Sequence, residues 1–272
     1  MTDWTVLDRA AASLDGRVGV FVANADGAAL YERDADAPYP SASVIKIPIL
    51  MTLYADVAAG RLSLDDRVPV GERVPGSGVL RHLPDLGDLS VRDHAMLMTI
   101  VSDNTSTNRV IERVGLDRVG VRLTEWGCTV TKLRRKMFDI AAAGRGMDNV
   151  ASARELGSML VRLIRGELVD RATSDAVLAI LEQTQDHTLL RRYLSAGARV
   201  AHKTGSLEKV RNDAAVLWKD RAVVAVGLVD GVADIRRAQS LLGLLGWLAY
   251  GEAGGETGPE TKALPPEWPE GR

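Results

Sequence analysis

Short apolar runs bounded by turn-forming residues predict β-strands near both ends of the chain. The predicted strands cover residues 17–23, 28–33, 199–205, 210–218 and 222–230. The first two form a hairpin around Asn24-Ala-Asp-Gly27, a sequence that favours a turn. The last two are apolar at successive positions, which is typical of strands that are covered on both faces.

Helical periodicity before the first strand and after the last one predicts the elements that cover these strands. A first helix is expected over residues 3–14 and a last helix over residues 233–250. Because the strands at the two ends of the chain must pair to bury their apolar faces, we expect one sheet built from both ends. The two terminal helices are expected to cover its two faces.

Between these regions, apolar residues recur at helical spacing and follow capping residues. The predicted helices cover residues 43–59, 90–99, 104–114, 152–165 and 175–184. Loops are expected over residues 74–88 and 134–150, and a connection as long as the second is often functional.

The resulting prediction is a two-lobed α+β protein, in which an antiparallel sheet is flanked by the N- and C-terminal helices and an all-helical lobe is inserted. The α/β lobe takes residues 1–36 and 191–252, the helical lobe residues 37–190, and a flexible tail residues 253–272. The boundary between two lobes is a favoured position for an active site.

Composition narrows the choice of partners. The chain has 272 residues, a formal net charge of -2 and 4% aromatic residues, which argues against a nucleic-acid-binding face. No apolar run approaches the roughly 18 residues that a membrane-spanning helix needs. The one cysteine, Cys128, excludes an internal disulfide and a cysteine-based zinc site, and the four histidines lack metal-binding spacing. We expect a monomer that acts on a small molecule without a metal or cofactor.

The N-terminal segment indicates the cellular compartment in which the protein is expected to work. It carries Asp3, Asp8 and Arg9, and it lacks the basic and then apolar segments of a secretion signal. As written, the sequence therefore predicts a cytoplasmic protein. A mature form whose signal had been removed would look the same, and that form would be periplasmic or secreted.

Three short motifs carry nucleophilic and cationic side chains: Ser43-Val-Ile-Lys46, Ser102-Asp-Asn104 and Lys203-Thr-Gly205-Ser206. On a helix, residues three apart share a face, so the Ser43 hydroxyl and the Lys46 amine are expected to meet. Ser206 and Lys209 have the same spacing, but on an extended strand this offset points the two side chains in opposite directions. The first pair is therefore the candidate for chemistry.

This set supplies what acyl transfer to a serine needs. Ser43 is the predicted nucleophile and Lys46 its general base, because a desolvated lysine can lose its proton whereas arginine stays protonated. Ser102 is expected to pass a proton to the leaving nitrogen. Asn104 is expected to hydrogen-bond the amide of the substrate, and Lys203 to hold an anionic substrate group.

The residues after Lys203 are predicted to bind substrate, and they comprise Thr204, Gly205 and Ser206. The backbone N–H groups of Ser43 and Ser206 are expected to form an oxyanion hole, where one donor contributes about 3–4 kcal/mol in studied enzymes. Arg211 is a candidate second anchor for a carboxylate, and an ordinary solvated arginine is the alternative.

Together, the motifs resemble those of class A β-lactamases and related serine hydrolases, from residue 17 to about residue 250. Their surroundings also fit this family: Tyr39-Pro-Ser-Ala-Ser43 before a helix, Val101-Ser-Asp-Asn-Thr105 between two helices, and His202-Lys-Thr-Gly205 on a strand. The resemblance implies the two-lobed fold described above. It also implies a reaction that opens a β-lactam through an acyl-enzyme at Ser43.

Each motif taken alone also has a structural explanation. Serine is a favoured helix cap, so Ser43 and Ser102 would fit at helix ends, and Asp103 would fit there as well. The segment Lys203-Thr-Gly205 alone is typical of an edge strand. Catalysis is favoured because all three motifs occur together and in the order of the family.

One departure from the family concerns deacylation. Class A enzymes carry a Glu-x-x-Leu-Asn pattern in a loop after the second motif, and that Glu activates the deacylating water. The corresponding stretch here is Leu133–Asp139, and no Glu lies between Glu125 and Glu155. Asp139 is the nearest carboxylate, with a side chain one methylene shorter than Glu, and it is the candidate for this role, with a loop or capping residue as the alternative. We therefore expect acylation to proceed and deacylation to be slow.

Three functions are consistent with the three motifs and the missing loop Glu. The first is a β-lactamase-like serine acyl-hydrolase that opens a β-lactam or a related amide or ester. The second is an acyl trap or sensor that resembles penicillin-binding proteins and stays acylated. The third is a cytosolic esterase or peptidase with a substrate that is not a lactam.

Overall fold

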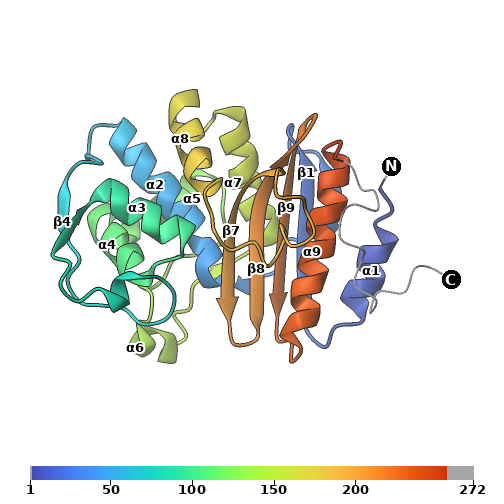
Figure 1. Cartoon of the computed structure of the whole chain (residues 1–272), viewed down its shortest axis with the longest axis horizontal. Helices are drawn as coiled ribbons and strands as arrows, with labels where there is room; N and C mark the ends of the chain where they lie inside the picture. The colour runs from blue at the N-terminus through green and yellow to red at the C-terminus, as the bar shows by residue number, and fades with distance from the viewer. Residues whose placement is uncertain (1, 256–272) are drawn as a thin grey trace.

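The computed structural model describes residues 2–255. A five-stranded antiparallel sheet lies at its centre, in the order β2-β1-β9-β8-β7 (Figure 1). The strands are β1 (Arg17–Asn24), β2 (Ala29–Arg33), β7 (Arg199–Leu207), β8 (Val210–Trp218) and β9 (Ala222–Asp230). β1 pairs with β9 along its whole length, so the two ends of the chain meet in the middle of one sheet. This pairing confirms the predicted α+β architecture.

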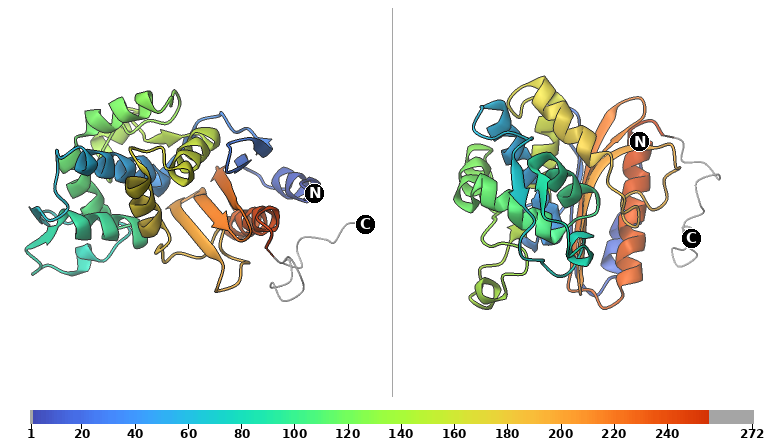
Figure 2. Two further views of the ribbon diagram at one scale, coloured as in Figure 1. Left: turned by 90° about the horizontal axis from the view of Figure 1, so that it is seen from above. Right: turned by 60° about the vertical axis from the view of Figure 1, so that its left-hand side comes forward.

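The two terminal helices, α1 (Thr5–Ala12) and α9 (Ile235–Glu252), flank the sheet. The expectation that they cover opposite faces was wrong, because both pack on the same face and share one apolar core with it (Figure 2). The other face is covered by α7 (Ala153–Arg165) and the helical lobe, which form a second core. Each face thus has its own cover, as the apolar strands require.

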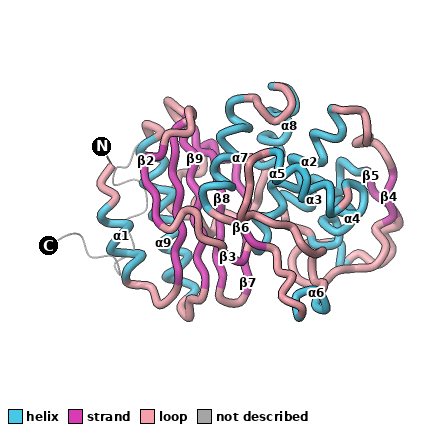
Figure 3. Tube along the Cα trace, turned by 180° about the vertical axis from the view of Figure 1, so that it is seen from behind, coloured by secondary structure: helices cyan, strands magenta, loops and turns pink. Residues whose placement is uncertain are grey.

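The helical lobe contains the remaining helices (Figure 1). They are α2 (Lys46–Ala58), α3 (Val91–Ile100), α4 (Asn104–Val114), α5 (Leu116–Glu125), α6 (Ile140–Gly144) and α8 (Arg171–Leu181), with short 3-10 helices at Ala42–Ile45 and Leu80–His82. Two small ribbons complete the lobe: β3 (Tyr39–Pro40) with β6 (Val150–Ala151), and β4 (Arg67–Pro69) with β5 (Asp88–Ser90). The β3–β6 ribbon lies between the sheet and the helices (Figure 3).

The predicted helix over residues 43–59 is in fact two elements. A 3-10 helix over Ala42–Ile45 precedes α2, which begins only at Lys46. Pro48 has no N–H to donate to the carbonyl of residue 44, so it fits only in the first turn of an α-helix. The proline therefore sets the start of α2, and it leaves Ser43 in the tighter turn ahead of it.

Other boundaries also differ from the prediction. α5 was not foreseen, because Gly115 suggested a helix end rather than a short break between two helices. α8 begins before the predicted residue 175, because the Asp170 side chain accepts the Thr173 N–H at 2.7 Å and caps the helix there. The short helix α6 lies inside the predicted loop over residues 134–150.

Two further predictions from the sequence concern the C-terminal tail and membrane-spanning helices. The tail expected over residues 253–272 lies outside the described residues from residue 256 onward. Within residues 2–255, no helix is both long and apolar enough to cross a bilayer.

Candidate active site

The three motifs lie on elements that converge between the sheet and the helical lobe. Ser43 lies in the 3-10 helix over Ala42–Ile45, which packs against β7, the strand that carries Lys203. Ser102 lies in the turn between α3 and α4, and Lys46 in the first turn of α2 is hydrogen-bonded to it. The fold thus brings together residues that are far apart in the sequence.

Lys46 is the centre of the polar contacts in this site. Its side chain is 1% exposed, and the amine Nζ lies 2.9 Å from the Ser102 carbonyl oxygen, 3.0 Å from Ser102 Oγ and 2.9 Å from Asn104 Oδ1. The carbonyl and amide oxygens can only accept hydrogen bonds, whereas the hydroxyl can also donate one. A neutral amine offers two N–H donors and one lone pair. Three hydrogen bonds donated by Nζ fit a protonated ammonium, and a neutral Lys46 fits when the Ser102 hydroxyl donates to it instead.

The electrostatics of the two buried lysines favour different protonation states. Burial lowers the pKa of Lys46 well below its usual value, and the positive charge of Lys203 lowers it further, with Asp103 opposing. Burial also lowers the pKa of Lys203, to about 8, although Asp213 and Asp186 act in the opposite direction. Of the two lysines, Lys46 is thus the better suited to accept a proton, and Lys203 to carry positive charge near neutral pH.

Ser43 is half-buried and lies one helical turn before Lys46. Within residues 2–255, the Lys46 amine bonds to Ser102 and Asn104, and no hydrogen bond joins it to the Ser43 hydroxyl. Catalytic hydrogen bonds are often long in unliganded enzymes and tighten only when substrate binds. The role of Lys46 as the base for Ser43 therefore stays a prediction.

Gly205 allows β7 to approach the nucleophile closely. A Cβ at this position would lie 2.8 Å from the backbone nitrogen of Ser43 and 3.0 Å from that of Val44. The backbone N–H of Ser43 therefore lies beside the strand that continues into Ser206. This arrangement is what the predicted oxyanion hole requires.

The other predicted substrate-binding residues follow along the β7–β8 hairpin. Lys203 Nζ donates to the Thr204 carbonyl at 2.8 Å, and Ser206 is exposed opposite Arg211 on β8. Arg211 Nη1 donates to the carbonyls of Leu207 and Val210, at 2.6 and 2.7 Å. These bonds fix the guanidinium at the turn of the hairpin, so Arg211 has a structural contact whether or not it also binds substrate.

Sequence reasoning missed Asp186, which lies in the connection between α8 and β7. Its carboxylate accepts hydrogen bonds from the hydroxyls of Thr188 and Thr204, and it lies near Lys203. Burial raises the pKa of Asp186, but these hydrogen bonds and the charge of Lys203 outweigh burial and leave that pKa below its usual value. Asp186 is thus an anion that offsets part of the positive charge on β7. No motif marks it in the sequence.

Asp103 and Ser77 hold the turn that carries Ser102. The buried Asp103 carboxylate accepts the Ser106 N–H at 2.9 Å and the Leu80 N–H at 2.8 Å, so it caps α4 and fixes the preceding loop. The Ser77 hydroxyl donates to the Ser102 carbonyl at 2.7 Å. These contacts match the structural reading of Asp103. Ser77 was missed because only the fold brings it to the turn.

In the loop that was expected to carry a deacylating carboxylate, the candidate Asp139 caps a helix. Asp139 is exposed, and its Oδ1 accepts the Ala142 N–H at 2.9 Å, which makes it the N-cap of α6. Within residues 2–255, Asp139 makes no hydrogen bond to Ser43 or Lys46. Its catalytic role stays a prediction, and the contact that it does make is the capping one.

Asn108 on α4 fixes the centre of this loop. Its Nδ2 donates to the Met137 carbonyl at 3.1 Å, and its Oδ1 accepts the Met137 N–H at 2.8 Å. Further along, Arg135 pairs with Asp148 at 2.9 Å and ties the two ends of the loop together. The loop is therefore held in one position, with Met137 and Phe138 at its centre.

His202 and Cys128 are two other potentially reactive side chains, and their surroundings do not favour a catalytic role. His202 is fully buried on the far face of β7 and lies 3.2 Å from the Asp213 carboxylate. Burial raises the pKa of the Cys128 thiol to about 12, so this side chain is a poor nucleophile. Within residues 2–255, no cluster of three or more His, Cys, Asp and Glu side chains could hold a metal ion.

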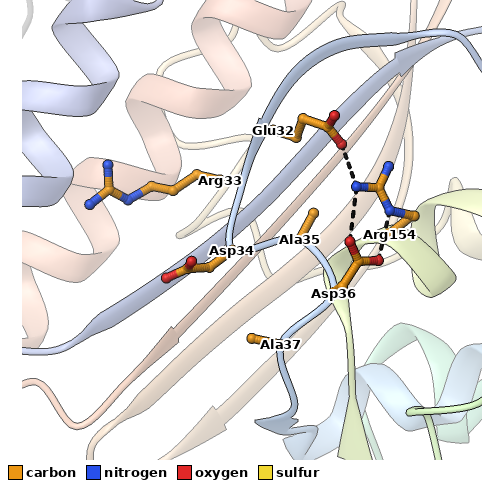
Figure 4. A pocket seen from close by; sticks show the side chains of 7 residues that line it. All are labelled: Glu32, Arg33, Asp34, Ala35, Asp36, Ala37 and Arg154. Carbon is orange, nitrogen blue, oxygen red and sulfur yellow. Dashed lines mark hydrogen bonds and ion pairs between the residues drawn. The ribbon is translucent and has the colours of Figure 1, made fainter.

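A separate concavity of about 370 Å³ lies beside β2 and α7. It is lined by residues 32–37 and Arg154 (Figure 4). Arg154 donates to Asp36 at 2.7 Å and also pairs with Glu32, so its charge is already neutralised by its neighbours. The arrangement ties α7 to the end of β2.

The fold is the one expected of the β-lactamase-like serine hydrolases, and comparison with known proteins agrees. Residues 4–253 match the profile of the "Beta-lactamase enzyme family". The chain belongs to this family.

Two further comparisons place the chain among individual relatives. Beta-lactamase L2 of Stenotrophomonas maltophilia is 28% identical over 227 residues, which cover 80% of this chain and 72% of L2. The crystal structure of a β-lactamase from Sphaerobacter thermophilus DSM 20745 is 30% identical, with a TM-score of 0.85 over 93% of this chain and 98% of that one.

PBP-A is also similar, at 27% identity and a TM-score of 0.80 over 91% of this chain and 95% of that one. A mutant of PBP-A, solved as an acyl-enzyme complex with penicillin G, is 28% identical with a TM-score of 0.81. The aligned region covers 91% of this chain and 94% of the chain of that mutant.

Proposed function

We propose that this protein opens β-lactams through an acyl-enzyme at Ser43 and releases the product slowly. The observation that carries the proposal is the environment of Lys46. Burial lowers the pKa of its amine, which is hydrogen-bonded to Ser102 and Asn104 and lies one helical turn after Ser43. Membership of the β-lactamase family supports the lactam as the substrate class.

The acylation step uses the contacts around Lys46. Ser43 Oγ attacks the lactam carbonyl carbon as its proton passes to Lys46 Nζ, and the backbone N–H groups of Ser43 and Ser206 stabilise the developing oxyanion. The carbon–nitrogen bond of the ring then breaks. The proton moves from Lys46 through the Ser102 hydroxyl, 3.0 Å away, to the leaving nitrogen. The opened lactam stays attached to Ser43 as an ester.

Substrate orientation comes from the positive charge on β7 and the amide of Asn104. Protonated Lys203 and the Ser206 hydroxyl hold the carboxylate that penicillins carry, and the Thr204 hydroxyl joins them once it turns from Asp186 to the substrate. Arg211 adds positive charge at the end of the same hairpin. Asn104 Nδ2 donates one N–H to the Pro75 carbonyl at 3.0 Å, which leaves its second N–H for the amide of the substrate.

Deacylation needs a base that activates water, and the site offers a poor one. Asp139 is occupied as a helix cap, and Asp148 is paired with Arg135. The loop residue that Asn108 fixes beside α4 is Met137, which has no acid–base chemistry. Without a positioned base, hydrolysis of the ester loses the roughly 100- to 10,000-fold that general base catalysis supplies. The acyl-enzyme is therefore expected to accumulate.

The second candidate function is an acyl trap or sensor, in which the stable adduct is itself the functional state. The similarity to PBP-A favours it, because a mutant of PBP-A was solved as an acyl-enzyme complex with penicillin G. The two functions share the acylation chemistry and differ only in the rate of release. A cytosolic esterase or peptidase is the third reading.

The discriminating experiment follows turnover and intact mass in one sample of the protein mixed with a chromogenic cephalosporin. We expect a rapid burst of about one ring opening per protein, a matching mass increase, and then slow turnover. Many fast turnovers would point to an efficient β-lactamase, and a burst without turnover to the trap. The absence of both colour and adduct, with activity on small esters, would overturn the proposal in favour of the esterase.

A further inference from the structure

The loop beside the site carries an aromatic residue in an unusual backbone conformation. Within residues 2–255, four residues other than glycine have positive φ: Asp34, Ala42, Ser102 and Phe138. Ala42 precedes the nucleophile and Ser102 binds Lys46, so two of these strained positions belong to the site. Phe138 has a φ of 59°, and such a value is rare for a bulky side chain. Strained backbone of this kind gathers at functional sites.

The Phe138 ring and the side-chain amide of Asn104 both border Gly76. Gly76 is in contact with both this ring and Asn104, because a Cβ at position 76 would lie 2.5 Å from Phe138 Cε2 and 2.7 Å from Asn104 Nδ2. Asn104 Nδ2 is the atom that keeps one N–H for the substrate. A group attached to the amide of a substrate that Asn104 holds would therefore lie near the Phe138 ring.

Phe138 is not required to fill the core. Its side chain is 46% exposed, and it belongs to neither apolar core of the described residues. The residues on either side hold it in place: Met137 is bonded through its backbone to Asn108, and Asp139 caps α6. An exposed aromatic ring on a fixed backbone is preorganised for binding, because little conformational entropy is lost when a ligand packs on it.

We infer that Phe138 is a specificity-determining residue, whose ring packs on an aromatic acyl side chain attached to the substrate amide. The inference rests on the proposed function, since it concerns the same substrate. Packing between two aromatic rings changes an equilibrium or rate by about three- to tenfold. Phe138 should therefore favour a penicillin with an arylacetyl side chain over one with a small alkyl side chain.

The test compares rate constants of acylation for penicillin G and for 6-acetamidopenicillanic acid, which keeps the amide but lacks the ring. Intact mass is followed in the wild type, Phe138→Ala, Phe138→Gly and the control Ile140→Ala. Glycine tolerates positive φ, so Phe138→Gly keeps the loop conformation even if alanine disturbs it. Ile140, two positions after Phe138, is the first residue of α6 and is 72% exposed. Thermal unfolding of each variant reports any purely structural effect.

We expect the wild type and Ile140→Ala to prefer penicillin G, and Phe138→Gly to lose about three- to tenfold of this preference through a slower rate with penicillin G. An unchanged ratio between the two substrates in Phe138→Gly would overturn the inference and leave the proposed function intact. Failure of the wild type to form an adduct with either compound would overturn the proposed function, and this inference with it.

Discussion

Gly205 of β7 lies so close to Ser43 that a Cβ on the glycine would come within 2.8 Å of the Ser43 backbone nitrogen. Cβ atoms essentially never approach backbone this closely, so a larger residue must push the strand and the 3-10 helix apart. The sheet comes from both ends of the chain and the 3-10 helix leads into the inserted lobe. This one contact therefore sets the spacing between the nucleophile and the cationic strand.

Replacement of Gly205 by alanine tests that spacing. We expect Gly205→Ala to lower the rate of acylation by β-lactams by about 100-fold, since a displacement of about 1 Å at a catalytic centre has this effect. Gly197 provides the matched control, because it is exposed and a Cβ there would meet nothing within 4 Å. The two rates are measured by intact mass, and equal rates in Gly205→Ala and Gly197→Ala would contradict this role for the contact.

The pH dependence of the acylation rate should reflect the protonation states of both Lys203 and Lys46. Lys203 holds an anionic substrate only while protonated, so with its pKa at about 8 the rate should fall as the pH rises above that value. Lys46 acts as a base only while neutral, and its lowered pKa extends the neutral form to lower pH, so the rate should also fall once the pH drops below that pKa. Arginine stays protonated, so Lys203→Arg should remove the alkaline fall in whatever rate remains.

The measurement is the second-order rate constant for penicillin G over a range of pH, in wild type and in Lys203→Arg. A methyl ester of the penicillin, which has no carboxylate for Lys203 to hold, serves as the substrate control. An alkaline fall that persists near the same pH in Lys203→Arg would assign it to another group.

Two substitutions of Asp139 distinguish a capping role of this residue from a catalytic one. Asparagine caps helices about as well as aspartate but cannot act as a general base, so Asp139→Asn should keep both stability and the rate of deacylation. Asp139→Ala should lower the free energy of unfolding by about 1 kcal/mol through loss of the cap. Urea denaturation and the decay of the acyl-enzyme mass check the two expectations. Slower decay in Asp139→Asn would restore the carboxylate as the deacylating base.

Asn108 is expected to be a structural anchor of the loop. Asn108→Ala removes both hydrogen bonds to the Met137 backbone in a buried setting, so the free energy of unfolding should fall by about 1–3 kcal/mol. Gln183 is the control, because it is exposed and makes one side-chain bond to the backbone. Its replacement by alanine should change stability by about 0.5 kcal/mol at most. Equal effects of the two substitutions would show that Asn108 does not anchor the loop.

The motif residues were predictable from sequence because their chemistry is encoded locally. Ser43 and Lys46 are three residues apart, and the placement of both depends on one short segment. The strands that carry Lys203 and Arg211 have apolar runs that are readable without any tertiary information. The overall α+β architecture followed from the same runs, since strands at the two chain ends must find partners.

The parts that were not predictable depend on contacts between distant segments. Asp186 reaches Thr204, and Asn108 holds Met137, through packing that no local pattern encodes. The shared face of α1 and α9 likewise depends on how the sheet twists and on which lobe occupies the other side. A role for Phe138 was not predictable from the sequence, because nothing local to it indicates a positive φ or a contact with Gly76.

The most direct test of the central claim locates the acyl group. Wild-type protein, Ser43→Ala and Lys46→Ala are each mixed with penicillin G, and intact mass and peptide mapping follow the reaction. We predict a mass increase of one whole penicillin on the peptide that contains Ser43, a much slower increase in Lys46→Ala, and no increase in Ser43→Ala. An adduct of the same mass on the Ser43→Ala protein, or on any other serine of the wild type, would contradict the account.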